Sequence, residues 1–157
     1  MNQIKKFVVF SLDLQRYALP LTAVERIVQA VHVTTLPNAP AIVLGMIDVA
    51  GRVLPVLNLR RRFRQPERKV GSADQFLIAH TTRRTVVLAV DEAQEVIERS
   101  SAEIVASSQI IPGLDHIQGV AKLRDGLVLI HDLEKFLSLD ETASLDDAMG
   151  LEVARGA

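Results

Sequence analysis

The side chains that could catalyse a reaction or bind a metal are few in this chain of 157 residues. No cysteine is present, which excludes disulfides, thiolate metal sites and cysteine nucleophiles. The four histidines, which lack the His-x-x-x-His spacing of metal ligands on one helix face, are His32, His80, His116 and His131. Asp48 and Asp132 could serve as general acid and base, but Asp132 stands where a helix cap is expected. No serine has a G-x-S-x-G context and no glycine-rich phosphate loop is present, so we expect no catalytic residue, metal site or cofactor.

The most concentrated charge is a basic run that could bind nucleic acid or an acidic partner. Its members are Arg60, Arg61, Arg62, Arg64, Arg68 and Lys69. The run holds one aromatic residue, Phe63, which we expect to be buried because it aligns with Leu137 in an internal repeat. The net charge of −1 argues against a dedicated nucleic-acid binder, and the alternative is a solvated helix end and linker. Acidic residues between 91 and 103 would allow head-to-tail packing with related domains.

The elements that must position these side chains are short strands in that internal repeat. Residues 7–28 and 76–97 match at a constant offset of 69, and each copy has an apolar strand, a polar turn and a second apolar strand. Next comes a Thr or Asp followed three residues later by Glu or Gln, a spacing typical of a capping box, which predicts a short helical turn. These pairs are Thr22 with Glu25 and Asp91 with Gln94. We expect the apolar residues behind each cap to face inward.

A second match, at an offset of 74, relates residues 45–63 to residues 119–137. Each copy contains a glycine, a strand, a tight turn and a second strand. Asn58 or Asp132 follows, and both residue types suit the N-cap of a short helical turn.

The two copies predict an all-β chain of two small units, at residues 7–64 and 74–139. Each unit has four clear strands, and we expect a fifth around residues 29–34 and 98–103. Small curved sheets of this size commonly close into barrels, which removes their exposed edges. The polar stretch 65–73 is the expected hinge between the units.

The tail, residues 140–157, has a helix-like spacing of apolar residues. Leu145, Ala148, Met149 and Val153 predict a short amphipathic helix on the barrel surface. A disordered tail is the alternative, because Gly150 costs about 1 kcal/mol within a helix. No apolar run approaches the roughly 20 residues needed to span a bilayer, so we expect no membrane insertion. A cysteine-free chain suits a reducing cytoplasm.

Several segments resemble the CheW family, the coupling proteins of bacterial chemotaxis, and the likeness extends over about residues 6–139. The matching segments are Phe7–Phe10, Tyr17–Leu21, Leu36–Pro40, Gly45–Leu59 and Ile117–Leu133. The resemblance implies two intertwined five-stranded β-barrels of the Src-homology-3 kind, within a single CheW-like domain over residues 1–139. It also implies a non-catalytic cytoplasmic adaptor associated with receptor arrays. Its partners would be the regulatory domain of a CheA-type histidine kinase and the cytoplasmic tip of a methyl-accepting chemoreceptor.

The candidate partner-binding residues lie at the expected junction between the two units. They are Val24, Arg26, Ile27, Val28, Met46, Val49 and Ala50. They could form a groove for a receptor helix, or the apolar members could belong to the core. The family usually carries an acidic residue at position 26 and an arginine at position 50, so its acid–Arg pair is absent here from both positions. Losing both charges avoids leaving one unpaired.

Three other functions remain open. The chain could be a small barrel that binds nucleic acid through residues 60–69, or an enzyme of unknown reaction. It could also be a CheW-like coupler of another chemosensory pathway, such as twitching or gene-regulatory signalling. A pull-down with CheA-type kinases would separate the adaptor from the first two.

Overall fold

The structure, a computed structural model, describes residues 3–106 and 117–156, with side chains as far as residue 150. The strands are β1 (Ile4–Leu12), β2 (Gln15–Pro20), β3 (Val24–Gln29), β4 (Val43–Val49), β5 (Arg52–Leu57), β6 (Gln75–His80), β7 (Thr85–Val90), β8 (Glu92–Ser100), β9 (Val105–Ala106), β10 (Ile117–Leu123) and β11 (Gly126–His131). The helices are α1 (Leu59–Arg62) and α2 (Leu139–Gly156), with 3₁₀ turns η1 (Leu21–Ala23), η2 (Ser101–Glu103) and η4 (Leu133–Lys135). The predicted all-β class is confirmed.

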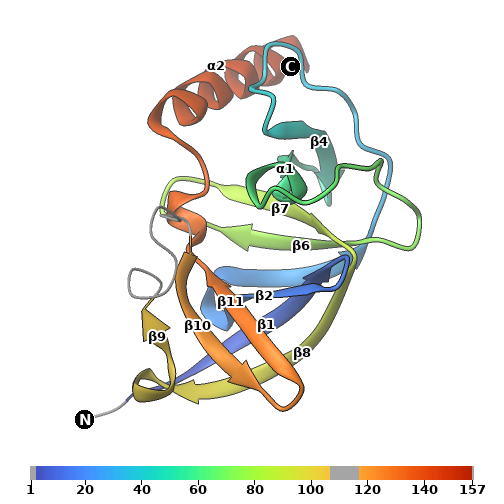
Figure 1. Cartoon of the computed structure of the whole chain (residues 1–157). Helices are drawn as coiled ribbons and strands as arrows, with labels where there is room; N and C mark the ends of the chain where they lie inside the picture. Colours follow the sequence, from blue (N-terminus) through green and yellow to red (C-terminus); the bar gives the residue numbers. More distant parts are fainter. Residues whose placement is uncertain (1–2, 107–116, 157) are drawn as a thin grey trace.

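The strands form two sheets, and each sheet contains strands from both halves of the chain (Figure 1). The first sheet has the order β8-β1-β2-β11-β10-β9, and the second has the order β3-β6-β7-β5-β4. The front half therefore gives one hairpin to the first sheet and three strands to the second, and the back half gives one hairpin to the second sheet and four strands, including the short β9, to the first. Beyond β3, Thr34 bridges to Met46 of β4, and beyond η2 the chain returns as β9 beside β10. The predicted intertwining of two β units is confirmed.

The strand registers repeat at the same offsets as the sequence. Phe7 faces Pro20 in the first sheet. The equivalent pair in the second sheet, 69 residues further on, is Phe76 with Ala89. In each sheet β5 or β11 then runs parallel to the second strand of the other half's hairpin. Equivalent side chains therefore occupy equivalent places in the two sheets.

The helical turn predicted at Thr22 is present as the 3₁₀ turn η1 but without the capping box, and the turn predicted at Asp91 is wrong. η1 is capped by Pro20 without a side-chain hydrogen bond, and the residues from Val24 onward form strand β3. In the second copy β8 begins at Glu92, directly after Asp91. The fifth strand of each unit consequently starts earlier than residues 29 and 98. The expectation that the apolar residues behind the caps face inward is also wrong for Ile27 and Val96, which are 43% and 54% exposed. A β-bulge at Glu25 and another at Gln94 interrupt the in–out alternation from which a strand is predicted.

Three apolar cores hold the fold together. A small core inside the first sheet includes Phe7, Val9 and Ile130. Its counterpart inside the second sheet includes Phe76 and Ile78. The largest core lies between the sheets and extends under α1, η4 and α2. Alternate residues of one strand, such as β1, thus face two different cores.

The short turns after β5 and β11 are capped as predicted. The Asn58 side chain accepts a hydrogen bond from the Arg61 backbone N at 3.1 Å. The Asp132 side chain accepts one from the Glu134 backbone N, also at 3.1 Å. Each cap satisfies a backbone N–H that the first turn of a helix leaves free. Asp132 therefore has a structural role, as the repeat suggested.

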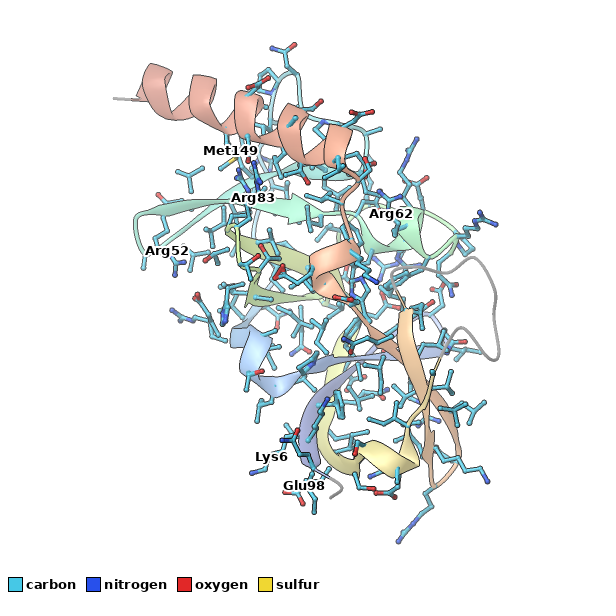
Figure 2. The ribbon with its side chains drawn as sticks, turned by 90° about the vertical axis from the view of Figure 1, so that its left-hand side faces the viewer. Lys6, Arg52, Arg62, Arg83, Glu98 and Met149 are labelled. Carbon is cyan, nitrogen blue, oxygen red and sulfur yellow. The ribbon has the colours of Figure 1, made fainter. Side chains whose placement is uncertain are left out.

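Helix α2 lies on the side of the second sheet that faces away from the first sheet (Figure 1), and its buried residues belong to the largest core. Leu145, Ala148 and Met149 are buried there. Asp146 makes ion pairs with Arg83 and Arg84 of the β6–β7 turn, and Figure 2 shows Arg83 and Met149 beneath the helix. Apolar burial and these ion pairs together outweigh the helix-weakening effect of Gly150.

Candidate partner-binding groove

A groove with a volume of about 390 Å³ lies where β3 of the second sheet meets β8 of the first. Its lining residues are Val8, Leu21, Val24, Glu25, Arg26, Ile27, Ala93, Gln94, Glu95 and Val96. Residues 24–27 and 93–96 correspond at the offset of 69, so the groove lies on the pseudo-twofold axis of the repeat. The repeat therefore builds this site from two equivalent strand segments.

A β-bulge shapes each wall of the groove. The β3–β6 ladder passes over Glu25 between Val24 and Arg26, and the β1–β8 ladder passes over Gln94. A bulge strengthens the local twist of a strand and redirects its side chains. The two bulges therefore turn neighbouring side chains out of the regular in–out alternation.

Three large apolar side chains of the groove are exposed to solvent. Ile27 is 43% exposed and Val96, its equivalent, is 54% exposed. Leu21, at one end, is 37% exposed. Exposed apolar groups gathered in a concave site, with charged groups at the rim, are typical of a binding surface. Isolated exposed residues of this kind would need no such explanation.

The charges along the groove break its symmetry. Arg26 is exposed on β3, and the equivalent position on β8 is Glu95, also exposed. The apolar floor is thus nearly symmetric, whereas the rim carries Arg26 beside the Arg52-paired Glu25 on one side and Glu95 on the other. A charged partner would be held in one of the two orientations that the floor alone would accept.

An ion pair fastens β3 to the β4–β5 hairpin beside the groove. Arg52 Nη1 lies 3.1 Å from Glu25 Oε2, and Arg52 Nη2 donates to Thr85 Oγ1 at 2.8 Å. The hydrogen bond from Arg52 holds the pKa of the Glu25 carboxyl below its usual value. The family's acid–Arg pair is missing at Arg26 and Ala50, but the structure joins the same two segments through neighbouring residues.

The structure separates the seven candidate residues into three groups. Val24, Arg26 and Ile27 come together in the groove. Val28 and Val49 pack against the core inside the second sheet, and Met46 packs against the core between the sheets. Ala50 is exposed on the hairpin turn. β3 and β4 are the two end strands of the second sheet, and β4 contributes no residue to the lining of the groove.

The β8 wall of the groove, residues 93–96, was not among the predicted binding residues. The sequence repeat offered the signal, since it maps Val24–Ile27 onto these positions. The missing information was that the two copies of this segment meet each other. Only the exchange of strands between sheets brings them side by side.

The residues considered for acid–base catalysis or metal binding show no catalytic arrangement in the described part of the chain. Asp48 accepts a hydrogen bond from the Gly51 backbone N in the hairpin turn. His131 is fully buried, and its ring lies edge-on to the rings of Phe63 and Phe136. His116 lies outside the described residues. Within the described part, no three His, Asp or Glu side chains gather as metal ligands, and no helix is long and apolar enough to cross a membrane.

The basic run is largely tied up in ion pairs with the chain's own carboxylates. Arg60 is buried and pairs with Asp13 and Asp91. Arg68 lies 2.7 Å from both Asp74 and Asp91, and these contacts raise its pKa further. Arg61 and Arg62 pair with Glu67 and Glu141, respectively. Phe63, expected to be buried, is half-buried and stacks on Tyr17. The run is thus an internal network that fixes the linker.

Known proteins similar to this chain share one family. The family described as CheW-like domain matches residues 6–143. A chemotaxis protein CheW from Treponema pallidum (strain Nichols) is 27% identical over 146 residues, covering 89% of this chain and 86% of the relative. One from Bacillus subtilis (strain 168) is 28% identical and covers 89% of this chain and 91% of the relative. The crystal structure of the scaffolding protein TtCheW from Thermoanaerobacter tengcongensis has a TM-score of 0.80 at 27% identity, covering 88% of this chain and 96% of that one.

Proposed function

Because the chain belongs to the family of CheW-like domains, we propose that it is a non-catalytic adaptor that couples chemoreceptors to a CheA-type histidine kinase in chemotaxis signalling. The kinase would carry out the chemistry, and this protein would hold kinase and receptor in a fixed register. It would act in the cytoplasm, at receptor arrays. Residues 1–139 would form the adaptor domain, with most of α2 as an addition to it.

The groove between β3 and β8 is the observation that carries the receptor part of this proposal. A receptor tip is a helical hairpin, and a helix binds by laying an apolar face into a groove. Ile27 and Val96 would contact that face from opposite walls. Arg26 and Glu95 would select its orientation, and the Ala50 turn would lie at the rim.

The internal ion pairs of residues 60–69 disfavour the nucleic-acid alternative. A nucleic-acid site needs basic groups free to replace counterions at phosphates. Arg60 and Arg68 are instead held by carboxylates of this chain, so a phosphate would have to compete with them. The two pathway alternatives, chemotaxis or another chemosensory system, differ only in the partners.

The test measures binding of purified chain to a receptor cytoplasmic fragment and, separately, to CheA-type kinases from the same genome. Val96→Glu places a charge on the groove wall, and Leu127→Glu is a matched control because both residues are 54% exposed and Leu127 lies on β11. We expect V96E to weaken receptor binding at least about tenfold, since a charge would be buried at the contact. L127E should bind like the parent.

Two results would contradict the proposal. Equal receptor binding by V96E and L127E would remove the groove as the receptor site. Failure of the parent chain to bind any of the kinases and receptors would remove the adaptor function itself.

A further inference from the structure

A second and larger groove opens at the end of the first sheet, away from α2. Its volume is about 700 Å³, and it lies between the start of β1, η1, η2 and β10. Phe7 and Ile130, both buried members of the first-sheet core, reach its floor. Ile104 forms part of its wall, and Lys5 and Lys6 lie at its rim. The groove thus gives access to the end of an apolar core.

The equivalent place in the second sheet is nearly full. Five lining positions correspond in the two places: Lys5 with Asp74, Pro20 with Ala89, Leu21 with Val90, Thr22 with Asp91, and Gln118 with Leu44. Only about 20 Å³ remains open in the second sheet, against about 700 Å³ in the first. As far as the described residues show, the two equivalent places therefore differ: the one in the second sheet is filled by the chain, and the one in the first sheet is open.

The linker before β6 fills the place in the second sheet. Val70 packs against the core there. Two hydrogen bonds hold the following residues along β3: the side-chain Nε2 of Gln29 donates to the Ser72 carbonyl at 2.5 Å, and the Ala30 backbone N–H donates to the Asp74 carbonyl at 3.0 Å. This half of the molecule shows that an extended segment with one branched aliphatic side chain fits the site.

A charge contact fixes the position of that linker. Arg68, two residues before Val70, donates to Asp74 at 2.7 and 2.8 Å and to Asp91 at 2.7 Å. The bidentate geometry with Asp74 makes this a strong, directional contact. The filled site therefore recognises a cation two residues before an aliphatic anchor.

The charge is inverted in the open groove. Lys5 stands in place of Asp74, and Thr22 stands in place of Asp91. Lys6 is beside it, and its contact with Glu98 is long, 3.8 Å, between two exposed side chains at the end of the molecule far from α2 (Figure 2). A segment bound here would need a carboxylate where the linker has a guanidinium.

We propose that the open groove binds an extended segment of a partner protein that carries an acidic residue two positions before a branched aliphatic residue. The aliphatic side chain would cover Phe7 and Ile130, and the carboxylate would meet Lys5. This binding surface adjoins the groove between β3 and β8 at Leu21, but Lys5, Phe7 and Ile130 line only the open groove, so the proposal does not depend on the receptor site.

The probes are capped peptides based on the linker residues 66–73, PERKVGSA. One has this sequence, one carries R68E, and one carries R68E together with V70A. Binding to the full ¹⁵N-labelled chain is followed by amide shifts of Phe7 and Gln118. The amide of Val90, in the filled site, serves as the internal control.

We expect the R68E peptide to shift the groove amides and to bind about threefold tighter than the parent peptide, the size that an exposed ion pair supports. The additional V70A change should weaken binding further, because the aliphatic anchor is lost. The Lys5→Glu chain should reverse the order of the two charged peptides. Lys5 is exposed, so this variant should keep the parent fold.

Absence of groove shifts with all three peptides at millimolar concentration would overturn the proposal. The same absence is expected if residues of this chain already fill the groove, and the proposal would be overturned in that case too. An order of binding that Lys5→Glu leaves unchanged would overturn the assigned chemistry of the partner.

Discussion

Arg60 is expected to be the most important charged side chain for stability. Its side chain is 9% exposed and connects three segments of the chain. Nη1 donates to Asp13 and to the Pro66 carbonyl, both at 3.0 Å, and Nη2 donates to Asp91 at 2.5 Å. The variant Arg60→Met keeps a long apolar side chain but removes all three contacts. We expect it to fold, with a lower free energy of unfolding.

The structure sets the size of the loss. Removing one partner of a buried ion pair typically costs about 3–5 kcal/mol, because the remaining charge is left without compensation. Here the Asp13 side chain is 45% exposed and the Asp91 side chain 23%, so water can reach both. Asp91 also keeps Arg68 at 2.7 Å. We therefore expect a loss of about 2–3 kcal/mol.

Urea unfolding of the full chain at pH 7 provides the measurement. The repeat supplies a matched control, since Glu134 occupies the place equivalent to Arg60 and accepts hydrogen bonds from Thr82 at 2.6 and 3.0 Å. These groups are exposed, so Glu134→Gln should change the free energy of unfolding by less than about 1 kcal/mol.

A loss below about 1 kcal/mol for Arg60→Met, or one equal to that of Glu134→Gln, would refute this reasoning. It would mean that the network around the linker contributes little, as surface ion pairs do. A change in the m-value would instead show that the variant alters the unfolded state or the cooperativity.

Two further predictions concern a turn and a carboxylate. Ala50→Gly should raise the free energy of unfolding by about 1 kcal/mol, because Ala50 has a φ of 52°, a conformation that glycine adopts without the strain caused by a Cβ atom. The control is the same change at Ala89, within β7, which should lower the free energy of unfolding. The midpoints of urea unfolding measure both effects. Asp74→Asn should destabilise the chain at pH 7, because contact with Arg68 holds the pKa of the Asp74 carboxyl below its usual value. That stabilisation is present above the unfolded-state pKa of about 3.9 and is lost as the pH falls through the lower folded-state value. The difference in free energy of unfolding between the Asp74→Asn variant and the parent should therefore shrink below about pH 4. A difference that stays constant with pH would contradict this prediction.

The local pattern of residues was enough to predict most strands and the two polar caps. Short apolar runs that contain β-branched residues, such as those of β1 and β7, favour a buried strand. Asn58 and Asp132 cap the turns that follow because a short polar side chain can reach a backbone N–H two or three residues ahead. These are interactions between near neighbours in the chain.

The bulged strands β3 and β8 show where local patterns fail. The spacing of Val24 and Ile27 is the same whether a helix or a bulged strand contains them. The choice depends on hydrogen bonds to β6, a strand about 50 residues away in the sequence. A distant partner can override a capping spacing because each ladder bond satisfies a backbone group that a single turn leaves open.

The sequence by itself therefore determined the repeat, the all-β class and the absence of cysteine chemistry, since these follow from residue types and near-neighbour spacing. Only the tertiary structure decided which segments meet. The exchange of strands between sheets places Val24–Ile27 beside residues 93–96, and it pairs Arg60 with carboxylates from both halves. Such contacts depend on the simultaneous packing of distant segments around shared cores, which no stretch of residues specifies alone.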